Sequence, residues 1–168
     1  MSLELSAKAE LMAPTIRGNS LYQVVNGPTW TQAETNSVNL GGHLAAIDSA
    51  QENSFLSQSF NFNTTAKWIG LREVAGEGDW QWTSGEAKTY TNWFYDPNIA
   101  WPGNAQEPNN WGVNEQYCLM YFHRNSGGAD PLGFWNDGVS NSTNAGIAEI
   151  PLTLSITRST TPKEGTGP

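Results

Sequence analysis

The chain is organised around the stretch Gln106-Glu107-Pro108-Asn109-Asn110-Trp111-Gly112-Val113-Asn114-Glu115-Gln116-Tyr117-Cys118. Glycine, proline and asparagine break any regular periodicity here, so we expect a loop. Its carboxylates and amides offer oxygen atoms, which calcium prefers as ligands. A second oxygen-rich turn, Trp135-Asn136-Asp137-Gly138, follows further along the chain. The two segments predict one calcium site, although Glu107-Pro108-Asn109 is also the composition of an ordinary turn.

The bulk composition narrows the class of protein. The 168 residues are 38% hydrophobic and 14% charged and include eight tryptophans, which favours one folded, aromatic-rich domain. The net charge is -8, with only eight lysines and arginines. Without a basic cluster, nucleic acid and anionic membrane surfaces are poor partners. The acidic, Asn-, Thr- and Ser-rich composition suits cations and hydroxyl-rich ligands, and equally suits simple solubility.

The sequence shows no pattern typical of a disulfide, a zinc cluster, a transmembrane helix or a catalytic site. The single cysteine, Cys118, cannot form an internal disulfide, and His43 and His123 are too few and too far apart for a zinc cluster. No apolar run reaches the length of a transmembrane helix, and the first residues lack the apolar core of a signal peptide. We find no catalytic triad pattern or phosphate loop, and we therefore expect no enzyme.

Periodicity and turn residues predict an α+β domain. Capping patterns at Thr29 and Ser49 open two expected helices, in which Gln32 reaches back to the Thr29 backbone. Val38 and Leu40 are expected to face the core with Trp30 and Ala33. Strands are expected over 21–25, 44–47, 68–71, 80–83, 117–122 and 146–150, and loops over 94–112 and 125–133. The order of one strand, two helices and then several strands argues against alternating βαβ units.

The domain is expected to span residues 15–152. Residues 1–14 carry no clear pattern and are interpreted as a leader or a cloning remnant. Residues 153–168 have the composition of a linker or of the start of a following module.

Several short motifs occur in a fixed order. They are Trp30-x-x-Ala33, Gly41-Gly42-His43-Leu44-Ala45-x-Ile47, Gln51-Glu52-Asn53, Trp68-Ile69-Gly70-Leu71, Trp80-x-Trp82-x-x-Gly85, Asn92-Trp93, Glu107-Pro108-Asn109 with Glu115, and Trp135-Asn136-Asp137. Each motif is weak alone. Together they resemble a C-type lectin-like domain over residues 19–151, a fold with two helices packed on antiparallel sheets and a long calcium-binding loop.

The resemblance implies a ligand set for one calcium ion. Matched residue by residue, the ligands are Glu107, Asn109, Glu115, Asn136 and Asp137. Three carboxylates offset the charge of Ca2+, and two amides supply neutral oxygens. Vicinal hydroxyls of a sugar would complete the shell and exchange hydrogen bonds with the same side chains. Pro108 is expected in the cis form, so that both flanking side chains point toward the ion.

The tripeptide Glu107-Pro108-Asn109 resembles members that prefer mannose-type sugars with paired equatorial hydroxyls. Trp111 follows the motif and is interpreted as a sugar-stacking residue, with blocked access and plain loop packing as alternatives. Glu73, Glu77 and Asn110 match a possible auxiliary calcium site. Asn110 and Gln116, however, stand where that site has acids.

The chain departs from the family pattern at its cysteines. Cys118 occupies one cysteine position and Ser140 its partner position, while Ser37 and Ala148 occupy the second pair. The missing cysteines, with a tail that resembles the opening of a calcium-binding β-sandwich repeat, imply a bacterial multidomain protein that is secreted or on the cell surface.

Two functions remain open at this point. The first is calcium-dependent binding of mannose-type glycans, because all five ligand types are present at motif spacing. The second is recognition of a protein partner by aromatic residues of two long insertions, residues 94–105 and 125–133, with calcium structural or absent. Fold alone does not decide between them.

Overall fold

The protein is described by a computed structural model that covers residues 13–60, 66–76, 78–96, 106–111, 114–125 and 128–153. It contains two helices, α1 (Trp30–Asn39) and α2 (Ala50–Ser59). The strands are β1 (Thr15–Arg17), β2 (Ser20–Val25), β3 (His43–Leu44), β4 (Lys67–Glu73), β5 (Trp80–Trp82), β6 (Tyr117–Asn125), β7 (Gly128–Gly138) and β8 (Ala145–Pro151).

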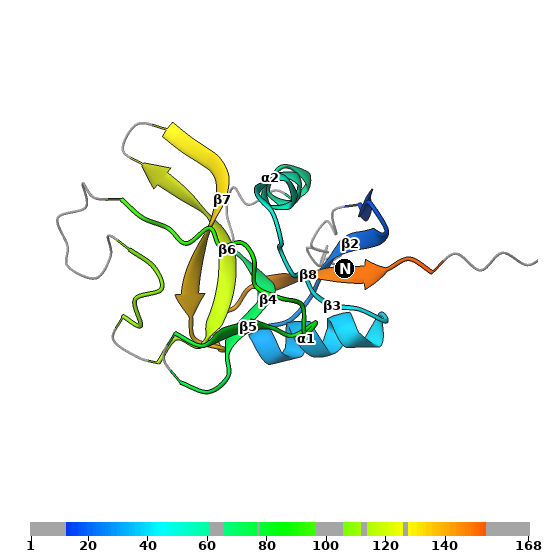
Figure 1. The fold of residues 1–168 in the computed structure, drawn as a ribbon, viewed down its shortest axis with the longest axis horizontal. Coiled ribbons are helices and arrows are strands. Elements are labelled where there is room, and N and C mark those ends of the chain that lie inside the picture. Colours follow the sequence, from blue (N-terminus) through cyan, green and yellow to red (C-terminus); the bar gives the residue numbers. More distant parts are fainter. Residues whose placement is uncertain are drawn as a thin grey trace, which may run out of the picture.

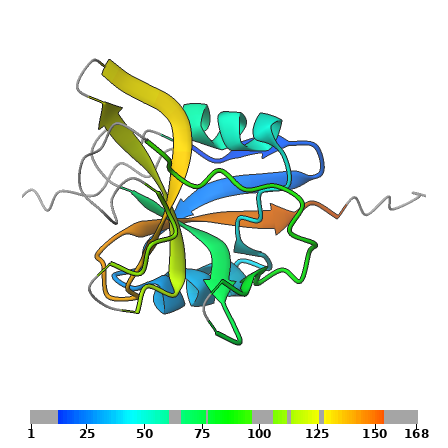
Figure 2. The ribbon, with the colours of Figure 1, turned by 60° about the vertical axis from the view of Figure 1, so that its left-hand side comes forward.

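The strands form one mixed sheet. Its order is β1-β2-β8-β4-β6-β7, with β3 paired to β8 and β5 paired to β4. Every pairing is antiparallel except that of β4 with β8. Figures 1 and 2 show α1 and α2 on opposite sides of β2 and β8. The α+β prediction is confirmed, and the parallel β4–β8 pair is a feature that the expectation of antiparallel sheets did not include.

Both helices begin at the predicted caps. The Thr29 hydroxyl accepts from the Gln32 N–H at 3.1 Å, and the Ser49 hydroxyl accepts from the Glu52 N–H at 3.3 Å, so each cap satisfies one unpaired backbone donor. The Gln32 side chain, however, accepts no hydrogen bond from the Thr29 backbone N–H in the described part of the chain, and its amide donates to Asn36 Oδ1 at 3.1 Å. That part of the prediction was wrong, because the Gln32 side chain bonds to its i+4 neighbour on the helix surface instead of turning back toward the cap.

The buried face of α1 differs from the prediction. Trp30, Ala33 and Ser37 are buried, whereas Val38 is 52% exposed and Leu40 43% exposed. Positions i, i+3 and i+7 lie on one helical face, and position i+8 continues that face only partly. The prediction that Val38 and Leu40 face the core was therefore wrong, and a small polar residue occupies the buried position instead.

Two predicted segments have different boundaries. The prediction of a loop over 125–133 was wrong. Strand β6 continues to Asn125, which pairs with Gly128 at the start of β7. The expected strand over 44–47 is shorter, since β3 ends at Leu44. The next residues are still buried, and the Ala45 N–H donates to the Ile147 carbonyl. Backbone bonds to β8 thus continue beyond the end of the strand.

Trp135 of β7 lies at the centre of the larger core cluster. Its ring is fully buried and makes edge contacts with Trp82, Tyr90 and Trp93 at centroid distances of 5.6–5.8 Å. Edge-to-face aromatic pairs contribute about 0.5–1.5 kcal/mol beyond burial. The packing of Trp135 fixes the position of the residues that follow it, Asn136 and Asp137.

A glycine of the strand motif is required by close packing. A Cβ added to Gly70 would lie 2.3 Å from the Leu44 carbonyl oxygen. Because backbone cannot move aside as a flexible side chain does, only glycine fits between β4 and β3.

Candidate functional site

The predicted calcium loop begins at a cis peptide bond. The Glu107–Pro108 bond is cis, which confirms the prediction for Pro108. The Glu107 N–H donates to the Phe94 carbonyl at 2.9 Å, and Gln106 pairs with Tyr95 in a β-bridge. These bonds hold the start of the loop against residues 94–95. This contact was not predicted, because no spacing rule links the two segments.

Asp137 holds the loop from the opposite side. Its carboxylate is fully buried and accepts from the Asn109 N–H at 3.1 Å and from the Asn110 N–H at 2.8 Å. Asn110 has a φ of 50°, a left-handed conformation that asparagine tolerates better than most residues. The turn directs two successive N–H groups at one carboxylate. A strand residue and a loop residue of the predicted ligand set are thereby brought together.

Two further predicted ligands converge on a single donor. The Trp111 N–H donates to Asn109 Oδ1 at 2.8 Å and to Glu115 Oε2 at 3.0 Å. Two oxygens that share one donor lie close to each other. The Glu115 N–H in turn donates to Asn110 Oδ1 at 2.9 Å. The loop thus places an amide oxygen and a carboxylate oxygen around one point.

Glu107 is buried without a full set of hydrogen-bond partners among the described residues. Its side chain is 7% exposed, and its Oε2 atom has no hydrogen-bond partner among the described residues. Burial, followed by the hydrogen bond and the charge of Asp137 and then the charge of Glu115, raises the pKa of Glu107 to about 9. Burial and the charge of Asp137 also raise the pKa of Glu115. Acids placed this close favour either a proton or a cation between them.

Asn136 and Asp137 are positioned through α2. Trp135 Nε1 donates to Asn53 Oδ1 at 2.9 Å, and Asn53 Nδ2 donates to the Gly133 carbonyl at 3.3 Å. The Asn136 amide donates to the Asp137 carbonyl. Asn53 belongs to a helix motif, and sequence alone did not reveal that it bonds β7 directly before the predicted ligands.

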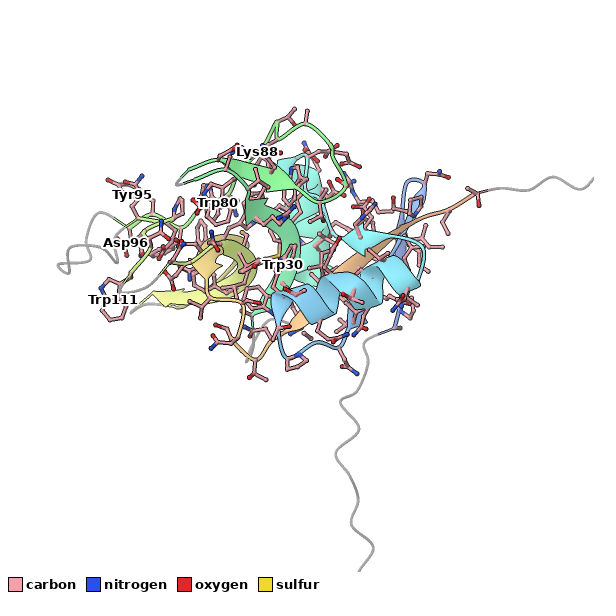
Figure 3. All side chains as sticks on the ribbon, turned by 90° about the horizontal axis from the view of Figure 1, so that it is seen from below. Trp30, Trp80, Lys88, Tyr95, Asp96 and Trp111 are labelled. Carbon is pink, nitrogen blue, oxygen red and sulfur yellow. The ribbon has the colours of Figure 1, made fainter. Side chains whose placement is uncertain are left out.

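Exposed aromatic side chains lie at the same end of the molecule as the loop. Trp111 is 62% exposed and Tyr95 is 60% exposed. Figure 3 shows Trp111, Tyr95 and Asp96 at one end, while Trp30 lies further inside. Trp111 is thus available for contact with a ligand, and its role as a loop-packing residue is not supported by its exposure.

The predicted auxiliary calcium residues have other contacts. Glu73 is buried at the end of β4, where its Oε1 accepts from the Gly78 N–H at 2.7 Å. Asn110 Oδ1 accepts from Glu115, as described above. Glu77 lies outside the described residues. The auxiliary site stays a prediction.

Acid side chains alone do not form a metal cluster here. Among the described residues, no three His, Cys, Asp or Glu side chains are grouped closely enough to hold a metal ion. The predicted set depends on two asparagines as well, and its chemistry fits a hard cation: oxygen donors only, with one buried carboxylate oxygen left without a partner. In the part of the chain that the structure describes, no helix is long and apolar enough to cross a membrane.

Comparison with known proteins shows the family. The model of the lectin C-type domain matches residues 26–148. The chain belongs to the C-type lectin domain family, and the predicted resemblance is confirmed.

Individual relatives cover the domain to different extents. The chain is 30% identical over 135 residues to lectin BRA-3 of Megabalanus rosa, covering 79% of this chain and 69% of that protein. It is 34% identical over 113 residues to the low affinity immunoglobulin epsilon Fc receptor of Mus musculus, covering 67% of this chain but only 28% of the receptor.

Solved structures confirm the fold. The cow C-type carbohydrate-recognition domain of CD23, crystallised in the presence of a GlcNAc2Man3 oligosaccharide, superposes with a TM-score of 0.66 at 28% identity, covering 84% of this chain and 95% of that one. A calcium-independent type II antifreeze protein superposes with a TM-score of 0.64 at 26% identity, covering 84% and 95%. The fold is thus shared by a carbohydrate-recognition domain and by an antifreeze protein that is independent of calcium.

Proposed function

We propose that this domain binds carbohydrate through a calcium ion held by Glu107, Asn109, Glu115, Asn136 and Asp137. The observation that carries the proposal is the burial of the Glu107 carboxylate close to Asp137, with one Glu107 oxygen left unpartnered. A buried carboxylate is stable in the charged form only with a compensating cation or a full set of donors. A divalent ion would supply that compensation and would present open coordination positions to a ligand.

The side chains of the site suit sugar hydroxyls. Carboxylate oxygens accept hydrogen bonds from hydroxyl groups, while asparagine amides donate to and accept from them. Calcium when bound would supply a Lewis-acidic centre for two neighbouring hydroxyl oxygens. The exposed ring of Trp111 would then lie against an apolar face of the sugar.

Mannose-type sugars are the proposed ligand class. The basis is the Glu107-Pro108-Asn109 tripeptide, which resembles that of members preferring vicinal equatorial hydroxyls. We expect the double substitution Glu107→Gln with Asn109→Asp to shift the preference toward galactose in a competition assay. Unchanged selectivity would show that the flanking loops choose the sugar.

A second candidate is recognition of a protein partner with calcium structural or absent. Two observations favour it: Trp111 and Tyr95 are both exposed, and a calcium-independent protein shares the fold. Aromatic side chains are frequent anchors of protein interfaces.

We also propose a location outside the cytoplasm, either secreted or at the cell surface, within a larger multidomain protein. The support is that one relative is a receptor of which this chain matches 28%. Glycan partners of a lectin are reached from such a location.

A glycan array measured with calcium and with EDTA tests the proposal. We expect binding to mannose- or fucose-type glycans in calcium, lost in EDTA and in the Asp137→Asn variant. Binding that EDTA leaves intact would exclude a calcium bridge. A melting temperature that does not rise in millimolar calcium would favour the protein-recognition candidate, since an ion that binds only the folded state must stabilise it.

A further inference from the structure

Two glutamates meet one tyrosine hydroxyl on the side of the sheet that carries α2. Tyr22 Oη lies 2.5 Å from Glu52 Oε1 and 2.9 Å from Glu149 Oε1. Tyr22 is on β2, directly opposite Glu149 on β8, and Glu52 is in the first turn of α2. Tyr22 is 1% exposed and Glu52 is 4% exposed. We call these three residues the phenol–carboxyl triad.

Each carboxyl group is fixed by its other oxygen. Glu52 Oε2 accepts from the Asp48 N–H at 3.0 Å, and Glu149 Oε2 accepts from the Ala46 N–H at 3.2 Å. Neither group can rotate away from Tyr22 without losing a backbone hydrogen bond. Both remaining oxygens therefore stay directed at the phenol.

The triad has two hydrogen-bond contacts at the phenol oxygen, but the phenol has only one hydroxyl hydrogen atom. A phenol has one hydrogen to donate, and ionised carboxylates accept only. With both glutamates ionised, one of the two contacts would set a carboxylate oxygen against a phenol lone pair. We propose that the folded protein holds one additional proton in the triad at neutral pH, so that one glutamate donates to Tyr22 while Tyr22 donates to the other.

The surrounding charges favour the same state. Arg17 of β1 lies 3.4 Å from Glu52 Oε1 and supplies one positive charge. Asp48 adds negative charge near Glu52, and Glu86 adds negative charge near Glu149. His43 lies near Glu86 and 3.6 Å from Glu34. Burial, as the largest cause, raises the pKa of the Glu52 carboxyl. Negative groups outnumber positive ones around the triad, and a bound proton reduces that excess.

The bound proton would make the stability of the folded domain depend on pH. The triad joins β2, α2 and β8, which are distant in sequence. A folded state that binds one more proton than the unfolded chain loses stability as pH rises, from the ordinary glutamate pKa up to the raised one. Over that interval the equilibrium constant for unfolding would rise by up to tenfold per pH unit.

Urea unfolding between pH 5.5 and 8.5 tests the proposal, in EDTA and with Glu107→Gln as the parent protein. That parent lacks the other buried carboxyl whose pKa is strongly raised. We expect the parent to lose stability with rising pH and the added Glu149→Gln substitution to flatten the dependence. Asp79→Asn is the control for loss of one carboxylate, because Asp79 accepts hydrogen bonds from the Gln81 side chain and lies outside the triad. It should leave the slope unchanged.

Carbon NMR of the glutamate carboxyl groups in the unaltered protein gives a second test that needs no variant. We expect the triad to keep its additional proton at pH 6.5, with the raised pKa of Glu52 favouring that group. Loss of this proton near pH 4.5, the usual value for glutamate, would overturn the proposal. So would a calcium-dependent stabilisation of the Glu107→Gln parent that disappears with Glu149→Gln, because the triad would then hold a cation in place of the proton.

Discussion

At the scale of single residues, we predict that Glu107 makes the stability of the calcium-free loop depend on pH. Its folded pKa of about 9 lies above the ordinary value of 4.5. The protonated Glu107 carboxyl therefore contributes fully to the free energy of unfolding below about pH 4.5, and this contribution is lost as pH rises toward 9. We expect Glu107→Gln to raise the melting temperature of the calcium-free protein at pH 8 by a few degrees, about 2–4 °C per kcal/mol in a chain of this size.

The same variant should not respond to calcium, whereas the unaltered protein should gain more stability from calcium at pH 8 than at pH 5. Scanning calorimetry with and without EDTA measures both effects. Glu34→Gln serves as the control for loss of one carboxylate. A Glu107→Gln protein that still melts higher in calcium would remove Glu107 from the ligand set.

We predict that Trp111 contributes to the affinity for the ligand and not to the stability of the fold. Because its side chain is 62% exposed, Trp111→Ala should leave the calcium-dependent melting temperature unchanged. Loss of ring stacking should weaken binding of a mannose-type glycan roughly tenfold, or about 1.4 kcal/mol.

Isothermal titration with that glycan measures the effect, and Tyr95→Ala, at similar exposure, is the matched control. Stronger binding after Trp111→Ala would mean that the ring blocks access to the site.

The resemblance to the C-type lectin family was enough to nominate the five calcium ligands and the cis proline. The sequence could not show which hydrogen bonds the oxygen atoms of these side chains make. The shared Trp111 N–H between Asn109 and Glu115, and the unpartnered oxygen of Glu107, depend on the loop conformation. Residue identity does not encode that conformation by any short-range rule.

At the scale of elements, α2 supports the site through one asparagine. Asn53→Ala would leave the buried Trp135 Nε1 without its acceptor, at a cost of about 1–3 kcal/mol. Since Trp135 precedes Asn136 and Asp137, calcium affinity should fall as well. Ser57→Ala is the control in the same helix, because its hydroxyl bonds only locally to Ser54.

Urea unfolding and calcium titration would measure the two effects of Asn53→Ala. Loss of stability with unchanged calcium affinity would show that Trp135 stays in place without the hydrogen bond to α2.

Helix starts were predictable because capping is local, while the buried face of α1 and the length of the β6–β7 hairpin were not. Val38 and Leu40 are apolar, yet they lie at the margin of the face that packs on the sheet. The hairpin extends to Asn125 and Gly128 through cross-strand pairing. Composition alone does not reveal such pairing, because Gly, Pro and Asp near the turn also favour a loop.

At the scale of the whole molecule, the fold is held without disulfides by a tryptophan-rich core. Ser37 of α1 and Ala148 of β8 occupy the positions matched to a family disulfide, and both are fully buried where α1 packs on β8. Cys118 is also buried, and burial raises the pKa of its thiol. It should therefore react slowly with an introduced pair.

We expect Ser37→Cys with Ala148→Cys to form a disulfide on oxidation. The bond would close a loop of about 110 residues and stabilise the oxidised form by roughly 4 kcal/mol relative to the reduced form of the same variant. Thiol titration and urea unfolding of both forms measure this, and each single substitution controls for the packing change. If the oxidised variant keeps three titratable thiols after unfolding, then positions 37 of α1 and 148 of β8 do not lie close enough for a disulfide to form. If the bond forms without a gain in stability, strain in the folded state offsets the entropy that the cross-link removes from the unfolded chain.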